Sequence, residues 1–472
     1  MSRSLAAGLW SPSRRSLVTR GLCALALLGT ATVASAAVGA APSGDPGDLD
    51  PTFGTNGTVV TSFPEQAAAG ASGIAVQGHN LIVGGGGLSS TAPDFLLARY
   101  RGDGTLDPRF GEGGRVITPM PSADGANGVE AVAVQPDRRI VAVGTAGLGS
   151  GNNIGFAVAR YLPDGKLDKT FGVNGVAITP VGPVGDGGAS GLAIQPDGKI
   201  VVVGGANDDD NNANFAVARY LPNGTLDTAF GNAGTLLISL AGGDAAASAV
   251  ALQADGKVVV AGTAIGPGVV GQEFAVVRLT DTGALDPTFG DAGIVLTQNL
   301  PGQQKGGLED IIIGRDGRIL VAGLGEVASG QGAFALLRFH TDGSLDSTFG
   351  GGTGKVLTEF PGGSGASSVL VQHDGRIVAA GAAGVPTTFA LAGYLPDGTL
   401  DTGFGTCGRT TTAIGENSGI SGAVLVQHGG RIVVAGTTFN STVTAGSFAL
   451  VRYLGKKAHD GYGSPPPEPC TA

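Results

Sequence analysis

The sequence predicts an all-β fold, a seven-bladed β-propeller whose blades each contain four antiparallel strands. Two phrases carry this prediction, because both recur in every unit and keep a constant phase to one another. Leu-Asp-x-x-Phe-Gly begins at Leu49, Leu106, Leu167, Leu226, Leu285, Leu345 and Leu400. Phe-x-x-x-Arg-Tyr, with single-residue departures, begins at Phe95, Phe156, Phe215, Phe274, Phe334, Phe389 and Phe448. Repeats of this kind are typical of arrays in which each unit buries its apolar faces against its neighbours.

Composition is the third observation behind this fold class. Gly accounts for 86 and Pro for 25 of the 472 residues, yet 42% of the chain is hydrophobic and only 14% is charged. So much Gly and Pro without a core would indicate a linker or a disordered chain. With this apolar fraction, the composition instead favours many short strands joined by many turns.

Read over residues 186–239, one unit contains four strands, here named a to d, at residues 191–195, 199–204, 215–220 and 234–239. Pro196-Asp197-Gly198 is expected to make the tight a–b turn, with Gly198 at positive φ. The run Ile200–Val203 is apolar on successive residues, which predicts a strand buried on both faces. Strands of this kind are typical of a blade that packs between two similar blades. An open β-solenoid is the alternative, but its repeats are usually far shorter.

The order of the phrases predicts how the ring closes. The repeat region, residues 49–454, begins with a corner and a strand d at residues 49–61, and it ends with strands a, b and c at residues 422–454. The last blade therefore lacks a strand d unless residues 57–62 supply it. We expect this segment to complete the blade, which leaves no unpaired edge within the ring.

Residues 1–36 are expected to be a signal peptide. Arginines precede the apolar run 21–29, and Ala34-Ser35-Ala36 offers a small-x-small cleavage site. The adjacent Arg14 and Arg15 fit either a twin-arginine or an ordinary Sec signal. We therefore expect a protein that is secreted, periplasmic or on the cell surface. Residues 37–48 are expected to be a short linker and residues 455–472 a proline-containing tail, and no later stretch has the length and apolarity expected of a membrane span.

The two phrases, together with Gln-Pro-Asp-Gly-Lys-Ile at Gln195–Ile200, resemble the delta-60 repeat family of exported bacterial proteins. The resemblance covers residues 49–454. It implies a propeller-like fold and an exported location, and it supplies no activity or catalytic residues. The chain departs from the pattern at Gly393, where the Arg is absent, and at Gly78-His79-Asn80, where the turn residues differ.

Acid and base recur in the two phrases, which favours ion pairs over catalysis. The arginines of strand c are Arg99, Arg160, Arg219, Arg278, Arg338 and Arg452, and the corner carries aspartates such as Asp107, Asp168 and Asp227. An active site needs one asymmetric group of residues, whereas these recur around the whole ring. We expect partly buried pairs that hold the blade corners together, and we assign no catalytic residue.

One acidic loop is the strongest candidate for a metal ion. Asp208, Asp210 and Asn212 are spaced like the opening of a calcium loop. Ala213 stands where such a loop needs Gly, and no distal Glu follows at the required spacing, so a solvated loop without metal is the alternative. We expect no cofactor other than this calcium candidate.

The two ends of a blade differ in their connections. In an antiparallel a-b-c-d blade, the a–b and c–d connections share one face, here called the repeated face. The b–c and d–a connections share the other, here called the variable face, because their lengths and residues differ between units. Rigid scaffolds often carry recognition on such loops, although loops also vary where nothing constrains them. We expect binding on the variable face, through Asp208, Asp209, Asp210, Glu273 and Glu326.

The expected function is binding of an extracellular or envelope protein, or another ligand, by a monomeric and non-catalytic propeller. A secreted propeller enzyme (a lyase, lactonase or glycoside hydrolase) with a site at the channel mouth is the alternative, and a purely structural surface protein is a third. The chain has 38 Asp and Glu against 28 Lys and Arg. Because this charge repels nucleic acid and anionic lipid, we expect neither as a partner.

Two cysteines of the expected mature chain, Cys407 and Cys470, are candidates for a disulfide. The tail after Leu454 is long enough to bring Cys470 to the corner that holds Cys407, and disulfides persist in an exported protein. Two independent free thiols are the alternative.

Overall fold

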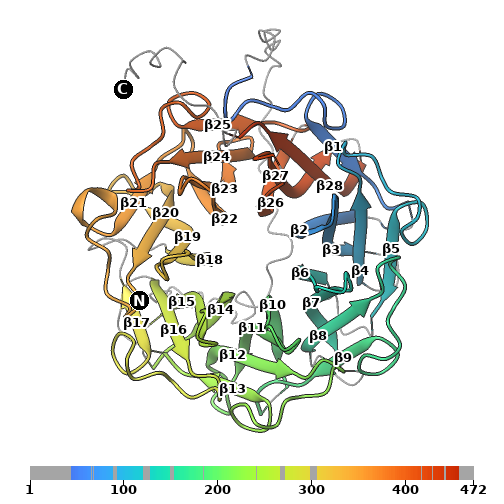
Figure 1. Ribbon diagram of the computed structural model, residues 1–472, viewed down its shortest axis with the longest axis vertical. Coiled ribbons are helices and arrows are strands. Elements are labelled where there is room, and N and C mark those ends of the chain that lie inside the picture. Colours follow the sequence, from blue (N-terminus) through green and yellow to red (C-terminus); the bar gives the residue numbers. More distant parts are fainter. Residues whose placement is uncertain are drawn as a thin grey trace, which may run out of the picture.

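The computed structural model describes residues 44–455, except 65, 67, 89–92, 121–127, 149–153, 184, 241, 266–271, 298–305, 416, 428 and 441–442. It confirms the predicted fold: seven four-stranded antiparallel sheets stand as blades around a central axis (Figure 1). In each blade, strand a lies nearest the axis and strand d lies at the rim (Figure 1).

The blades follow one another along the chain. Blade I consists of β2 (Ala68–Gln77), β3 (Asn80–Leu88), β4 (Pro93–Tyr100) and β5 (Arg115–Pro119). Blade II consists of β6 (Gly128–Val134), β7 (Ile140–Gly147), β8 (Ile154–Tyr161) and β9 (Val176–Thr179). Blade III consists of β10 (Gly187–Ile194), β11 (Ile200–Asn207), β12 (Ala213–Tyr220) and β13 (Thr235–Ile238). Blade IV consists of β14 (Ala245–Leu252), β15 (Val258–Ala264), β16 (Glu273–Leu279) and β17 (Ile294–Thr297).

Blade V consists of β18 (Gly307–Ile313), β19 (Ile319–Glu326), β20 (Gly332–Phe339) and β21 (Lys355–Thr358), with a short 3₁₀ turn, η1 (Gly350–Gly352), in its corner. Blade VI consists of β22 (Ser364–Val371), β23 (Ile377–Ala383), β24 (Thr388–Tyr394) and β25 (Arg409–Thr412). Blade VII consists of β26 (Asn417–Val426), β27 (Ile432–Asn440), β28 (Val443–Tyr453) and β1 (Thr58–Thr61).

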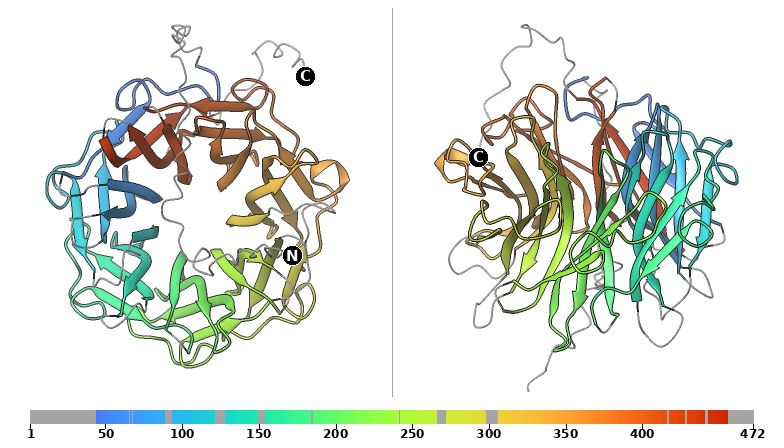
Figure 2. Two further views of the ribbon diagram at one scale, coloured as in Figure 1. Left: turned by 180° about the vertical axis from the view of Figure 1, so that it is seen from behind. Right: turned by 60° about the horizontal axis from the view of Figure 1, so that its bottom comes forward.

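The predicted closure of the ring is confirmed. β1 pairs antiparallel with β28, with Val59 opposite Leu450. Two backbone hydrogen bonds continue this pairing, from Asp50 N to Arg452 O at 2.8 Å and from Leu454 N to Asp48 O at 2.8 Å. Seen from behind, the blue and red ends of the chain share one blade (Figure 2). The two chain ends therefore replace the continuous c–d turn of the other blades.

The core lies between blades rather than within one sheet. Val201 and Val203 of blade III pack in one cluster with Val258 and Val260 of blade IV, and a cluster of this kind occupies every blade junction. This arrangement explains the apolar runs read from the sequence, because β11 is buried on both faces. The predicted turn geometry is also present, with Gly198 at a φ of 85°.

The inner strand of each blade carries an irregularity that the sequence did not reveal. In blade III the register shifts between Ala189 and Gly191. This brings the backbone of strand a against strand b, so that a Cβ on Gly204 would lie 2.0 Å from the carbonyl oxygen of Gly188. Glycine in the middle of strand b is therefore a packing requirement. The b–c hairpin is also tighter than expected, because β11 and β12 extend to the pair Asn207 and Ala213.

Candidate functional site

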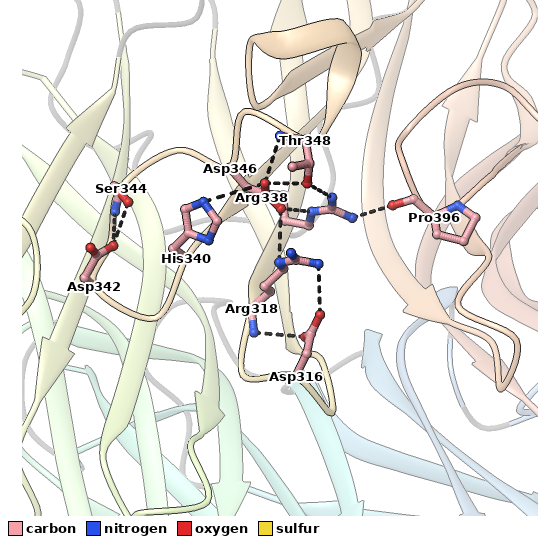
Figure 3. Close-up of polar contacts among 9 residues, drawn as sticks. All are labelled: Asp316, Arg318, Arg338, His340, Asp342, Ser344, Asp346, Thr348 and Pro396. Carbon is pink, nitrogen blue, oxygen red and sulfur yellow. Dashed lines mark hydrogen bonds and ion pairs between the residues drawn. The ribbon is translucent and has the colours of Figure 1, made fainter.

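The arginines and aspartates of the two phrases meet on the repeated face. In blade V, Arg338 Nε lies 2.7 Å from Asp346 Oδ2, and Arg318 Nε from the a–b turn lies 3.2 Å from the same oxygen (Figure 3). The other carboxylate oxygen accepts hydrogen bonds from Thr348 N at 2.9 Å and Thr348 Oγ1 at 2.6 Å. Arg338 also donates to the carbonyl oxygen of Pro396 in blade VI (Figure 3). The cluster thus ties one blade corner to the next blade.

Burial and partners together set the charge state of these aspartates. Burial alone would raise the pKa of Asp346, but hydrogen bonds from Thr348 and the charge of Arg338 outweigh it and lower the pKa to about 2. The same balance, with Thr288 and Arg278 as partners, lowers the pKa of Asp286 to about 2. Carboxylates that remain ionised at every ordinary pH are suited to permanent ion pairs and poorly suited to proton transfer.

The cluster recurs around the ring. Each guanidinium of strand c lies over the corner Phe of its own blade, in the pairs Arg99–Phe110, Arg160–Phe171, Arg219–Phe230, Arg278–Phe289, Arg338–Phe349 and Arg452–Phe53. Each also donates to a carbonyl oxygen of the following blade, at Pro163, Pro222, Asp281, Thr341, Pro396 and Gly102. Asp107, Asp168 and Asp227 are the ion-pair partners of Arg99, Arg160 and Arg219.

Blade VI departs from this pattern in the way its sequence indicates. Gly393 replaces the arginine, and a Cβ at this position would lie 2.6 Å from Cγ of Phe404. Arg376 from the a–b turn still contacts Asp401, as a–b turn cations contact the corner aspartate in five other blades. The corner Phe therefore occupies space that the arginine uses in the other blades, and the aspartate keeps a cationic partner.

These pKa values predict loss of stability in acid. A carboxylate with a folded pKa of about 2, against 3.8 when unperturbed, stabilises the fold above the unfolded pKa and loses that contribution as the pH falls through the folded value. We expect the free energy of unfolding in urea to be nearly constant from pH 7 to 5 and to fall between about pH 4 and 2. The Asp346→Asn variant should be less stable at pH 7 and show a shallower decline. Equal slopes for both proteins would contradict this assignment.

On the variable face, the carboxylate of Asp208 stabilises its own loop. Asp208 Oδ1 accepts hydrogen bonds from Asp210 N at 3.0 Å and Asn212 N at 2.9 Å. Asp208 Oδ2 accepts from Asn214 Nδ2 at 3.1 Å. The hydrogen bond from the backbone of Asn212 is the main cause of the lowered pKa of Asp208. Asp208 is therefore a loop-closing residue, and Asn212 and Asn214 are among its donors.

Neighbouring connections hold the same loop in place. Asn207 Nδ2 donates to Asp186 Oδ2 at 3.2 Å, and Ala213 N donates to Asp244 Oδ1 at 3.1 Å. Asp209 and Asp210 lie at the exposed tip. The loop thus presents these two carboxylates from a hairpin held by its own hydrogen bonds and by two neighbouring connections.

The other two acidic residues expected on this face are placed differently. Glu273 begins β16 and is half-buried, and Glu326 ends β19 with an exposed fraction of 8%. Both lie at the variable face, but neither is an exposed carboxylate at a loop tip. Of the five residues predicted to bind, the structure places Asp209 and Asp210 most openly towards solvent.

The described residues provide little support for the calcium hypothesis. Among them, no group of three or more His, Cys, Asp or Glu side chains is arranged to hold a metal ion. Both oxygens of Asp208 face N–H donors, which a cation would have to displace. Calcium binding at Asp208, Asp210 and Asn212 stays an untested prediction.

Charge is divided between the two faces. The carboxylates in the described b–c and d–a connections and the strand ends beside them are Asp94, Asp186, Asp208, Asp209, Asp210, Asp244, Glu273, Glu326 and Glu359. No Lys or Arg occurs in the described parts of those connections; the described basic residues lie in the a–b and c–d connections and the strand ends beside them. One of them, Arg115 at the start of β5, reaches the carbonyl oxygen of Ser62 at 2.9 Å. The described part of the variable face is therefore acidic, whereas most described basic residues of the repeated face lie in ion pairs.

The inner strands contain a bridge that sequence reasoning missed. Asp310 Oδ2 in β18 accepts hydrogen bonds from Ser368 Oγ at 2.6 Å and Val369 N at 2.9 Å in blade VI. Ser368 Oγ in turn accepts from Val424 N in blade VII at 3.2 Å. Blade III has Gly191 at the position of Asp310. This carboxylate joins three blades and has a structural role.

Six segments match a family model described as "Domain of unknown function (DUF5122) beta-propeller", at residues 80–110, 135–171, 195–230, 253–289, 314–349 and 372–404. Each segment runs from an a–b turn, or in blade I from the start of strand b, through strands b and c to the corner of the same blade. The match therefore covers the phrases that build the blade junctions. The chain is a β-propeller repeat protein.

Solved structures similar to this propeller repeat protein differ widely in what their names describe. Sqt1 of Chaetomium thermophilum is 13% identical, with 79% of this chain and 82% of that chain covered and a TM-score of 0.40. An ulvan lyase of polysaccharide lyase family PL25 is 8% identical, with 85% and 98% covered and a TM-score of 0.47. A gluconolactonase of Xanthomonas campestris is 12% identical, with 89% and 99% covered and a TM-score of 0.36. Similarities this weak carry no argument about function.

Two further comparisons concern the propeller repeat protein as a whole. Its sequence has no match among curated proteins. Within the part of the chain that the structure describes, no helix is long and apolar enough to cross a membrane.

The corner of blade VI holds one of the predicted disulfide residues. Cys407 has a φ of 52° and is disulfide-bonded. Cys470, its expected partner, lies outside the described residues, so the pairing of these two cysteines stays a prediction.

The structure also shows a second kind of contact between neighbouring blades of the propeller. The Tyr in this contact belongs to a repeated phrase, whereas its Thr partner does not. The last Tyr of strand c donates to, or accepts from, the last Thr of strand d in the preceding blade: Tyr161 with Thr118 at 2.9 Å, Tyr220 with Thr179 at 2.9 Å, Tyr394 with Thr358 at 2.8 Å and Tyr453 with Thr412 at 2.8 Å. At the junction of blades III and IV, Leu279 and Ile238 share one apolar cluster instead. A paired search for Tyr and Thr at fixed separation could have found this contact.

Proposed function

We propose that this protein is an exported, non-catalytic propeller scaffold that binds a cationic protein or envelope ligand through the b–c and d–a connections of its variable face. The resemblance to the delta-60 repeat family and the signal peptide expected at residues 1–36 support the exported location. The activity proposed is recognition, with the seven blades as a rigid support.

The division between the two faces is the observation that carries this proposal. On the repeated face the same Arg, Asp, Phe and Thr recur, and they contact one another or the next blade. The variable face has connections of different length and residue type, and its described connections carry acid without base. An uncompensated acidic surface attracts cationic partners and accelerates their association.

The hairpin of blade III is the part of this face best suited to recognition. Its backbone is held by Asp208 within the loop and by Asp244 from a neighbouring connection, and Asp186 from the other accepts from the side chain of Asn207. Because the loop is held before a partner arrives, less conformational entropy is lost on binding. Asp209 and Asp210 are exposed at its tip, where a Lys or Arg side chain could reach them.

Replacing Asp209 and Asp210 together by Asn should weaken binding of a cationic partner and leave the fold intact. An exposed ion pair contributes about 0.2–1 kcal/mol, so the double variant should raise the Kd roughly two- to thirtyfold. The measurement is calorimetric or fluorescence titration with a Lys-rich peptide, and then with basic proteins extracted from the host envelope. Added salt should weaken binding to the unaltered protein more than binding to the variant.

The matched control is Asp137→Asn with Asp197→Asn, which removes the same charge from a–b turns of the repeated face. This control should leave the Kd nearly unchanged. An equal loss in both double variants would show that net charge alone governs retention and would contradict the assignment to the variable face. Asp208 is unsuitable as a test residue, because its replacement would also release the loop.

A further inference from the structure

Blade VII is built from both ends of the chain (Figure 2), and the turn that joins it to blade VI is split between them. The corner glycine of blade VI, Gly405, donates from its N to Pro46 O at 2.7 Å, and Gly47 N donates to Leu454 O at 2.8 Å. At the other six junctions the acceptor belongs to a continuous c–d turn, at Asp103, Asp164, Asn223, Thr282, Asp342 and Asp397. Strands β26–β28 are therefore followed by a chain end rather than by another blade.

The corner that receives this split turn also carries the disulfide-bonded Cys407. The turn itself does not require a cysteine. Cys407 has a φ of 52°, and Asn56 and Asn174 have φ values of 50° and 54° at the same position in the corners of blades VII and II. The sulfur is therefore an addition to a corner that other blades build without it.

The sequence order shows what the disulfide encloses. The chain has two other cysteines, Cys23 and Cys470, and both lie outside the described residues. Cys23 belongs to the expected signal peptide, so Cys470 is the partner that remains in an exported protein. A bond from Cys407 to Cys470 closes a loop that contains β26, β27 and β28. The stabilisation typical of one disulfide corresponds to a roughly 30- to 1,000-fold lower population of the state in which the enclosed strands detach.

Without this bond, the last three strands depend on noncovalent contacts. β28 pairs with β1 over four residues, and Nε of Arg452 lies 3.0 Å from Asp50 Oδ2. Tyr453 OH donates to Thr412 Oγ1 of blade VI at 2.8 Å, and one apolar cluster joins blades VI and VII. Elements at a chain end open most readily, because no following element holds the end in place. Blade VII is therefore the blade expected to open first when the disulfide is reduced.

We propose that the Cys407–Cys470 disulfide is a redox-sensitive latch, which keeps blade VII closed in an oxidising compartment and releases it in the presence of a dithiol reductant. One thiolate of the dithiol attacks a sulfur of the bond and forms a mixed disulfide, and its second thiolate then displaces the attached cysteine. The two cysteines end as thiols with two protons gained, and the dithiol is oxidised to a disulfide. Cys407 is half-buried between the exposed Thr406 and the buried Gly408. The latch shares with the proposed function only the exported location.

Hydrogen exchange of the oxidised, full-length protein, measured by mass spectrometry with and without dithiothreitol, tests the latch. Reduction should accelerate exchange in β26–β28 and β1 roughly 30- to 1,000-fold, whereas exchange in β10–β12 of blade III should be unchanged. Cys407→Asn and Cys470→Ser should each show the fast exchange of blade VII without reductant. Asn is the replacement at Cys407 because Asn56 and Asn174 occupy the same position at the same φ, so this variant should fold.

The matched control is Cys407→Asn treated with dithiothreitol, whose exchange should not change further. Exchange of blade VII that reduction leaves unaltered would overturn the proposal. Equal acceleration in blades III and VII would also overturn it, because it would show a general loss of stability instead of local opening. Protection of blade VII that persists in Cys470→Ser but is lost in Cys407→Asn would identify a different partner and refute the loop around β26–β28.

Discussion

Deleting residues 49–62 should lower the Tm of the whole protein by roughly 10 °C or more, in one cooperative transition. The deletion removes β1, exposes the edge of β28 and takes away the fully buried ring of Phe53. It also removes Asp50, whose Oδ2 lies 3.0 Å from Nε of the buried Arg452. An unpaired buried charge costs about 3–5 kcal/mol, and loss of a core Phe side chain costs a similar amount.

Differential scanning calorimetry with circular dichroism measures this effect. Phe53→Ala should give a smaller shift of the same cooperative form, which keeps the test available if the deletion variant does not accumulate. Val60→Ser is the control on the same strand, because Val60 has an exposed fraction of 53% and should tolerate a polar side chain. An unchanged melting curve, or melting of one blade while the others persist, would contradict closure through β1.

The repeated phrases predicted the parts of this fold that depend on short-range pattern. Apolar residues on successive positions of strand b required burial on both faces, and β11 is buried on both. The offset of the phrases at the two chain ends required a strand from the N-terminal side to complete the last blade, and β1 does so. In both cases the order of residues along the chain determines which surfaces must be buried or which strand edge must be paired.

Other features depend on spatial neighbours that one repeat does not contain. The register shift in β10 arises where strand b has Gly204, which the sequence shows only as one glycine among many. Asp310 resembles any strand residue until Ser368 and Val369 of the next blade are placed beside it. Contacts across a junction could be predicted only after the order and closeness of the blades were known.

The acidic loop shows the same limit at the candidate site. Composition identified Asp208, Asp209 and Asp210 as one group, but the fold divides their roles. Asp208 closes the hairpin through Asp210 N and Asn212 N, whereas Asp209 and Asp210 are exposed. Spacing alone could not separate them, because side-chain hydrogen bonds to the backbone compete with ligand binding for the same carboxylate.

Replacing Arg338 by Met should destabilise the fold by about 3–5 kcal/mol, the cost of breaking a buried ion pair. The side chain of Asp346 is fully buried and that of Arg338 has an exposed fraction of 11%, so water cannot replace the lost partner. Arg318 contacts the same carboxylate but has an exposed fraction of 38%. Arg318→Met should therefore cost about 1 kcal/mol or less.

A double-mutant cycle measured by urea unfolding separates the pair from its surroundings. Arg338→Met combined with Asp346→Leu should cost less than the sum of the single variants, because no buried charge is then left alone. Arg338→Gly should be worse than Arg338→Met, even though blade VI has Gly393 at this position. In blade VI the side chain of Phe404 lies against Gly393, whereas in blade V Phe349 lies beneath the guanidinium, so removal of Arg338 leaves space that nothing fills. Equal costs for Arg338→Met and Arg318→Met, or strict additivity of the cycle, would show that the repeated ion pairs do not hold the blades together.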